Sequence, residues 1–150
     1  MNRRQLLQSL SAVTLVSAFP ARANPVHDAT FEAWLDTQFG PLPRARESVE
    51  VTLPALAENG NSVAITVSVD NPMVDDNHIR TIDLFAPQNP VPHLGRYHLS
   101  PSSGIAKVHT RIRLGGDQTV RAVARTSDNR LLIGGADIVV TEAACLDFLI

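Results

Sequence analysis

The sequence predicts an all-β protein, an antiparallel β-sandwich preceded by one short helix. After Pro43, much of the chain alternates apolar and polar residues with a period of two, which is the pattern of half-buried strands. Turn-forming Gly, Pro, Asn and Asp residues interrupt this alternation at short intervals. One stretch before Pro43 has helical spacing instead. Short strands, frequent turns and a single helix together indicate two sheets packed face to face.

Residues 1–23 have the features of an export signal. Arg3 and Arg4 form a positive start, residues 6–19 are apolar or small, and Ala21-Arg22-Ala23 fits a small-x-small cleavage site. The paired arginines suggest the twin-arginine route, with ordinary secretion as the alternative. We therefore exclude this segment from the predicted fold.

Charge and cysteine content exclude several classes of function. The three arginines of segment 1–23 are its only charged residues, so the rest of the chain has 10 of the 13 basic residues and all 15 acidic ones, a formal charge of −5. This balance argues against nucleic acid as the main partner, and no later stretch is long and apolar enough to cross a membrane. One cysteine excludes an internal disulfide. The five histidines (27, 78, 93, 98 and 109) have no zinc-site spacing, so we expect neither a metal nor a cofactor.

The helix is predicted over residues 28–40. Phe31, Trp34 and Leu35 recur at spacings of three and four, and Asp28 can cap the start. Gly40-Pro41-Leu42-Pro43 ends it. We expect this helix to pack on the domain, while an exposed Trp34 would favour a partner-binding helix instead.

The strands follow in a sandwich predicted over residues 46–141. Asn59-Gly60-Asn61 is a turn signal, Gly115-Gly116-Asp117 predicts a hairpin, and Ser127-Asp128-Asn129 predicts another. The number of short strands suggests a sandwich of the immunoglobulin-like kind, followed by a tail over residues 142–150. The predicted strands cover residues 49–53, 63–69, 79–85, 96–99, 105–114, 118–126, 131–133 and 136–141.

A basic patch is predicted on the hairpin of residues 105–126. If the two strands pair, their outward side chains gather on one face of the sheet. This face is either a solvated surface or a docking site for an anion or an acidic partner, because the arginine fork suits carboxylates and oxyanions. Its members are Lys107, Arg111, Arg113, Arg121 and Arg125.

Cys145 lies in the tail, after the strand-like residues 136–141. An unpaired cysteine in such a place is either a chemical handle held away from the body or a small buried hydrophobe. The chain has no G-x-S-x-G nucleophile motif and no phosphate-binding glycine loop. The sequence therefore does not predict a preorganised enzyme site.

The chain resembles the SoxY family, the sulfur-carrier subunit of the periplasmic thiosulfate-oxidising (Sox) system. The resemblance runs from about Phe31 to Thr141 and rests on several blocks in the family's order. The twin-arginine start agrees with it. The blocks are Ala57-Glu58-Asn59-Gly60, Asp70-Asn71-Pro72-Met73, Asn89-Pro90-Val91-Pro92, Leu99-Ser100-Pro101-Ser102-Ser103-Gly104, Thr110-Arg111-Ile112-Arg113-Leu114 and the run from Gln118 to Ala124.

The resemblance implies a periplasmic protein without catalytic activity of its own. It implies a sandwich that pairs with a smaller β-sandwich subunit, SoxZ, and a C-terminal arm whose cysteine carries sulfur intermediates covalently. A haem enzyme would join thiosulfate to that thiol, a hydrolase would release sulfate, and a dehydrogenase would oxidise the remaining sulfur. The residue that the resemblance assigns to attachment is Cys145.

The tail departs from the family pattern. The family ends in Gly-Gly-Cys-Gly-Gly, whereas this chain has Ala143-Ala144 before the cysteine and Leu146-Asp147-Phe148-Leu149-Ile150 after it. Three hypotheses stay open. The protein is a divergent sulfur carrier, or a Sox-like scaffold whose tail packs as an extra strand or docks on a partner, or an unrelated protein such as a thiol-dependent enzyme or a chaperone-like module.

Overall fold

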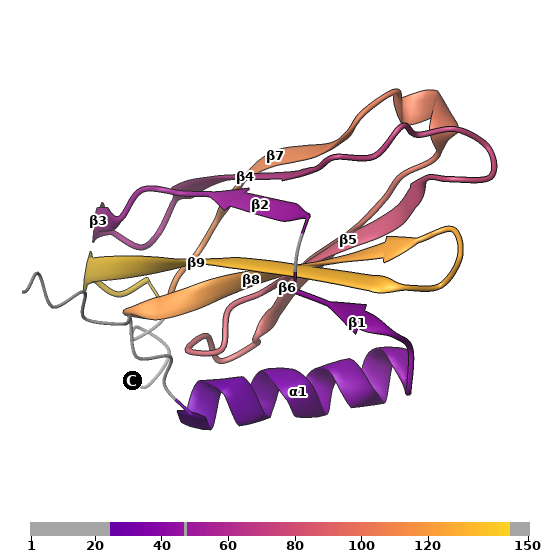
Figure 1. The fold of residues 1–150 in the computed structure, drawn as a ribbon. Coiled ribbons are helices and arrows are strands. Elements are labelled where there is room, and N and C mark those ends of the chain that lie inside the picture. Colours follow the sequence, from indigo (N-terminus) through magenta and orange to yellow (C-terminus); the bar gives the residue numbers. More distant parts are fainter. Residues whose placement is uncertain (1–24, 47, 145–150) are drawn as a thin grey trace, which may run out of the picture.

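The fold is a sandwich of two sheets with one helix on its outside, as Figure 1 shows. The computed structural model describes residues 25–46 and 48–144. The helix is α1 (Pro25–Phe39), and Pro101–Ser103 form one 3-10 turn. The strands are β1 (Arg44–Ala45), β2 (Val49–Thr52), β3 (Leu56–Asn59), β4 (Val63–Val69), β5 (Ile79–Phe85), β6 (His93–His98), β7 (Ala106–Ile112), β8 (Gln118–Thr126) and β9 (Leu131–Glu142).

The two sheets differ in size and in strand direction. The smaller one has the order β2-β4-β7 and is antiparallel throughout. The larger one has the order β1-β9-β8-β5-β6, and β3 also pairs with β9. Both β1 and β3 run parallel to β9, whereas the other neighbours are antiparallel. The predicted all-β sandwich with one N-terminal helix is confirmed, with two short parallel pairings that the sequence did not predict.

The main core lies between the sheets. Along β4 every second side chain is buried, from Val63 to Val69, as the period-two alternation predicts. Ile82 and Leu84 of β5 face the same core from the larger sheet. On β8, the buried side chains of this core include the small residues Ala122 and Ala124, which let the sheets approach closely.

Helix α1 covers the outer face of the larger sheet. Phe31 and Leu35 are fully buried there, against Phe85 and Val123. The Trp34 ring is half-buried and lies 5.0 Å from the Phe85 ring centroid. The helix therefore packs on the domain, as expected from the spacing of its aromatic residues.

The ends of α1 differ in how well the sequence predicted them. The helix begins at Pro25, so the prediction that Asp28 caps it was wrong: Asp28 lies inside the first turns. The predicted end is confirmed at Gly40, whose φ of 64° is a conformation that glycine adopts without a Cβ penalty. Within the described residues, no helix is long and apolar enough to cross a membrane.

The predicted hairpin over residues 105–126 was wrong. β7 pairs with β4 in the smaller sheet, while β8 pairs with β5 and β9 in the larger one. The connection at Gly115-Gly116-Asp117 therefore crosses between the sheets. Alternation shows which side of a strand is buried, but it carries no information about the sheet to which the strand belongs. The second predicted hairpin is confirmed, because β8 and β9 pair directly across Ser127-Asp128-Asn129.

Candidate functional site

The candidate site is the end of the sandwich where β9 stops and the tail begins, which we call the tail-exit end. Three segments are joined there by backbone hydrogen bonds. The Gly60 amide donates to the Glu142 carbonyl at 2.8 Å, and the Leu114 amide donates to the Gly60 carbonyl at 2.9 Å. The Ala144 amide then donates to the Leu114 carbonyl at 3.0 Å. These bonds fix the chain up to the residue directly before Cys145.

The tight join explains the glycine at position 60. A Cβ built there would overlap with the Leu114 carbonyl oxygen and would lie 3.1 Å from the Ala144 amide nitrogen. Only glycine lets the turn after β3 approach both backbones this closely. Gly60 is therefore required by the path of the tail rather than by its own φ angle.

A side chain adds a further bond beside this join. The Asp117 carboxylate accepts a hydrogen bond from the Val140 amide at 2.7 Å. Asp117 belongs to the connection that crosses between the sheets, and Val140 lies near the end of β9. The turn-forming aspartate thus fixes the last strand to the crossing connection.

Asn89 fixes a neighbouring loop, residues 86–92, to the same connection. Its amide group donates to the Arg113 carbonyl at 2.8 Å and its oxygen accepts from the Gly115 amide at 2.8 Å. The Gln118 side chain also donates to this oxygen, at 3.3 Å. Asn89 is buried, so these bonds hold the loop in place without help from solvent.

A groove of about 460 Å³ lies between this loop and the tail exit. Its surface is mostly apolar, and Val91 within it is 71% exposed. Arg113 is exposed at its edge, and its guanidinium has no hydrogen-bond or ion-pair partner among the residues that the structure describes. The groove is lined by Asn89, Pro90, Val91, His93, Leu94, Arg113 and Ala144.

Cys145, predicted as the attachment site, lies outside the described residues, as do the residues after it. Its assignment stays a prediction. Ala144, immediately before it, is buried and lines the groove. The structure therefore defines the position of the residue that precedes the thiol-bearing segment.

The predicted basic patch does not form. Lys107 and Arg111 are exposed on the outer face of the smaller sheet, and Arg113 follows β7. Arg121 and Arg125 lie on β8, on the helix-facing side of the larger sheet. Because the sandwich separates these two groups, the prediction of one docking face that contains all five basic residues is wrong. The error follows directly from the incorrect hairpin.

Several of these arginines have local partners instead. Arg111 Nε donates to the Ser62 hydroxyl at 2.6 Å, and Arg125 donates to the Asn129 side chain at 2.8 Å. The Arg121 guanidinium lies over the Phe31 ring of α1, 5.0 Å from its centroid. Such contacts are typical of side chains that stabilise a fold.

A buried ion pair beneath α1 was missed by the sequence analysis. Asp83 is fully buried, and its Oδ1 accepts hydrogen bonds from His93 Nε2 at 2.9 Å and Arg96 Nε at 2.8 Å. The His93 ring also lies 5.2 Å from the Trp34 ring centroid. The available signal was an aspartate inside an apolar strand, because a buried carboxylate needs a charged partner.

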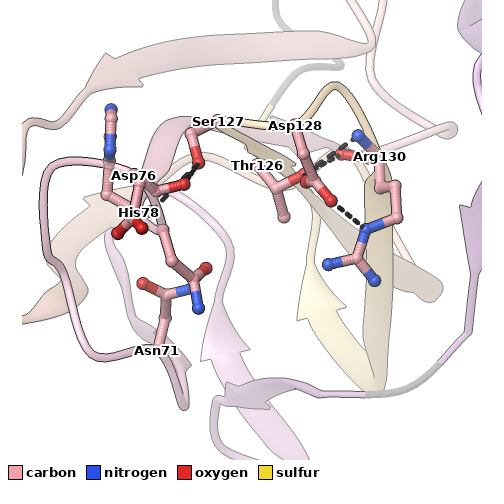
Figure 2. Close-up of polar contacts among 8 residues, drawn as sticks. Asn71, Asp76, His78, Thr126, Ser127, Asp128 and Arg130 are labelled. Carbon is pink, nitrogen blue, oxygen red and sulfur yellow. Dashed lines mark hydrogen bonds and ion pairs between the residues drawn. The ribbon is translucent and has the colours of Figure 1, made fainter.

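The opposite end of the sandwich, which we call the hairpin end, gathers serine, histidine and aspartate (Figure 2). Ser127 Oγ donates to the Asp76 backbone carbonyl at 3.0 Å and accepts from the His78 backbone amide at 3.2 Å. The His78 ring is 3.2 Å from the Val74 carbonyl oxygen, measured from Nδ1. Since the ring contacts a backbone carbonyl and not the serine hydroxyl, this cluster is not a catalytic triad.

The rest of the hairpin end is closed by its own hydrogen bonds. Thr126 Oγ1 donates a hydrogen bond to Asp128 Oδ1 at 2.5 Å and accepts one from the Arg130 amide at 2.9 Å. Arg130 Nε donates to Asp128 Oδ2 at 2.7 Å. The Thr126 hydrogen bond, followed by that of Arg130, lowers the pKa of Asp128 below its usual value of 3.8. Among the described residues, no group of three or more His, Cys, Asp or Glu side chains could hold a metal ion.

Comparison with known proteins identifies the family. The family model described as "Sulfur oxidation protein SoxY" matches residues 36–145. The chain belongs to the SoxY family. The matched region of this SoxY chain ends at Cys145, so the five residues that follow lie outside it. No curated protein sequence matches the chain.

Solved structures agree on the fold. The sulfur carrier protein SoxY from Chlorobium limicola f thiosulfatophilum is 23% identical, with a TM-score of 0.64, and the match covers 76% of this chain and 98% of that one. A superoxide reductase (neelaredoxin) from Ignicoccus hospitalis is 20% identical, with a TM-score of 0.55 and coverage of 63% and 80%. A superoxide reductase from Nanoarchaeum equitans is 18% identical, with a TM-score of 0.53 and coverage of 65% and 99%. At these identities the likeness shows a shared sandwich fold.

Proposed function

We propose that this SoxY protein is a covalent sulfur carrier in thiosulfate oxidation. It holds sulfur intermediates on the Cys145 thiol and presents them to partner enzymes, and it catalyses no step itself. The observation that carries this proposal is the family match over residues 36–145, which includes the cysteine and ends on it. The SoxY protein from Chlorobium limicola f thiosulfatophilum, which is described as a sulfur carrier, supports the same role.

The geometry of the tail-exit end suits a carrier. A carrier needs a rigid base from which a reactive group can reach other proteins, since tethering raises its effective concentration at each partner. Gly60, Leu114 and Ala144 supply such a base through consecutive backbone hydrogen bonds. The segment beyond Ala144 then starts from one fixed point.

The loading reaction needs an oxidant. A new bond forms between the Cys145 sulfur and the outer sulfur of thiosulfate, the thiol loses its proton, and an electron pair leaves. The partner haem enzyme takes up that pair, so the carrier needs no cofactor of its own. A hydrolase then releases sulfate from the adduct, and a dehydrogenase oxidises the sulfur that remains on the cysteine.

Further parts of the proposal concern location and assembly. Arg3 and Arg4 support export by the twin-arginine route. That route leads to the periplasm, the compartment in which a Sox system oxidises thiosulfate. A smaller SoxZ-type β-sandwich subunit is the proposed stable partner. Co-purification of a tagged chain from the periplasmic fraction tests both points.

Intact mass spectrometry tests the central proposal. The protein is purified from cells that oxidise thiosulfate and is measured before and after treatment with a reducing agent. We expect extra mass from sulfur or thiosulfate that disappears on reduction, and no such mass in Cys145→Ser. A bare chain in both samples contradicts carriage. Normal thiosulfate oxidation by the Cys145→Ser strain would instead favour a scaffold role.

A further inference from the structure

The groove at the tail-exit end is preformed and directly continuous with the tail. Ala144 lines it and is also the last described residue before Cys145. Asn89 ties the loop that forms one wall to Arg113 and Gly115 on the other side. The groove therefore does not need an incoming partner in order to take shape.

The residues after Cys145 match the groove in chemistry. The segment after Cys145 has one charged side chain, Asp147. The other four are apolar, like most of the groove surface: Leu146, Phe148, Leu149 and Ile150. Arg113 stands at the groove edge without a charged partner among the described residues. Arg113 is also adjacent in sequence to Leu114, whose carbonyl fixes Ala144. Opposite charges and apolar surfaces thus occur together on the tail and in the groove.

The reach of the tail also fits. Asp147 is the third residue after Ala144, so an extended chain places it at most about 11 Å away. The whole segment Leu146–Ile150 stays within about 22 Å of the Ala144 position. Val91 and Arg113 line the same groove as Ala144, so both are within the range of this segment.

We propose that Leu146–Ile150 docks in this groove, with Asp147 paired to Arg113 and the apolar side chains against Val91 and its neighbours. Docking of the tail would limit the access of solvent reagents to the Cys145 thiol. Apolar burial drives docking, and the ion pair sets the register of the tail. This inference goes beyond sulfur carriage and does not depend on it.

A disulfide trap tests the contact directly. In the full chain with Cys145→Ser, we introduce Val91→Cys together with Phe148→Cys and add a mild oxidant. We expect an intramolecular disulfide, detected as loss of both free thiols without a change of oligomeric state. Ile105→Cys with Phe148→Cys is the matched control, because Ile105 is a comparably exposed apolar residue (64%) near the other end of the sandwich. Equal trapping in both pairs, or none in the first, overturns the proposal.

Thiol reactivity gives a second, independent readout with Cys145 present. Arg113→Glu and Asp147→Arg each replace the proposed ion pair by two like charges, and each is expected to raise the rate of Cys145 modification by Ellman's reagent about tenfold. The double variant Arg113→Glu/Asp147→Arg restores the pair and is expected to return the rate to near the wild-type value. Lys107→Glu, an exposed charge reversal on the smaller sheet, is expected to leave the rate unchanged.

Other occupants of the groove give different results. If a partner protein fills it, Val91→Asp weakens partner binding while the Cys145 rate stays at the wild-type value. If a second copy of the chain fills it, the rate depends on protein concentration. Either result overturns tail docking, while mass spectrometry of the sulfur adduct remains a separate test of the proposed function.

Discussion

The two ends of the sandwich are built on different principles. At the hairpin end, polar side chains bond each other and the backbone, as Ser127 and Thr126 do. At the tail-exit end, the backbone join at Gly60 is equally tight, but Val91 and Arg113 face outward without partners among the described residues. An end whose side chains bond one another stabilises the fold, whereas an end with exposed apolar and charged side chains is suited to bind another segment or molecule.

The variant with the largest expected effect tests how closely the backbones pack at Gly60. Gly60→Ala is expected to lower the free energy of unfolding by about 3 kcal/mol, because the added Cβ overlaps with the Leu114 carbonyl oxygen. Urea denaturation measures the change. Gly95→Ala is the control, since a Cβ there meets no atom within 4 Å, and its effect is expected to stay within about 0.5 kcal/mol. Similar values for the two variants would show that the join is not close-packed.

The second test loosens the groove wall. Asn89→Ala is expected to cost about 2 kcal/mol of unfolding free energy, since it leaves the Arg113 carbonyl and the Gly115 amide without their partner. Asn89→Asp keeps the acceptor for Gly115 but places a buried carboxylate oxygen against the Arg113 carbonyl oxygen, so it is expected to cost at least as much. We also expect faster Cys145 modification in Asn89→Ala, because the groove loses its fixed shape. An unchanged rate of Cys145 modification would show that the shape of the groove does not affect the tail.

The third test addresses the hairpin end. Ser127→Ala removes the hydroxyl that bonds Asp76 and His78, and is expected to lower the unfolding free energy by about 1 kcal/mol. Sulfur loading and Cys145 reactivity are expected to stay at wild-type levels, since this end lies across the sandwich from the tail. Loss of loading in a folded Ser127→Ala protein would contradict a purely structural role.

The smallest effect concerns acid stability. The pKa of Asp128 is lowered in the folded state, so its ionised form adds stability that is fully present above 3.8 and is lost as the pH falls through the folded pKa. Asp128→Asn is expected to remove this part of the acid dependence and to leave the rest. Denaturation curves from neutral pH to below 3.8 check it. An identical acid profile in the variant would mean that Asp128 is not linked to folding.

The sequence predicted what depends on local periodicity. The alternation from Val63 to Val69 identified a half-buried strand, and the spacing of Phe31 and Leu35 identified the face of the helix that packs. It could not decide between a hairpin and a crossing at Gly115-Gly116, because both need the same turn residues. The parallel pairings of β1 and β3 with β9 depend on long-range contacts, which no local pattern encodes.

The candidate site was predicted less completely than the fold. The Asn89-Pro90-Val91-Pro92 block was noticed as a resemblance, but its role in forming a groove appears only when Arg113 and Ala144 are brought beside it. The basic patch failed for the same reason that the hairpin failed. A residue's neighbours across a sandwich are set by the sheet to which each strand belongs, and that information lies outside any short window of sequence.

The attachment of the tail to β9 also has a mechanical consequence. β9 is 12 residues long and pairs with β8 along most of its length, with β1 and β3 on its other edge. A partner that pulls on the tail along this strand loads those hydrogen bonds in shear, so that many of them share the force at once. Under the proposed carrier function, β9 would therefore resist tension applied to the residues after Ala144 without unravelling.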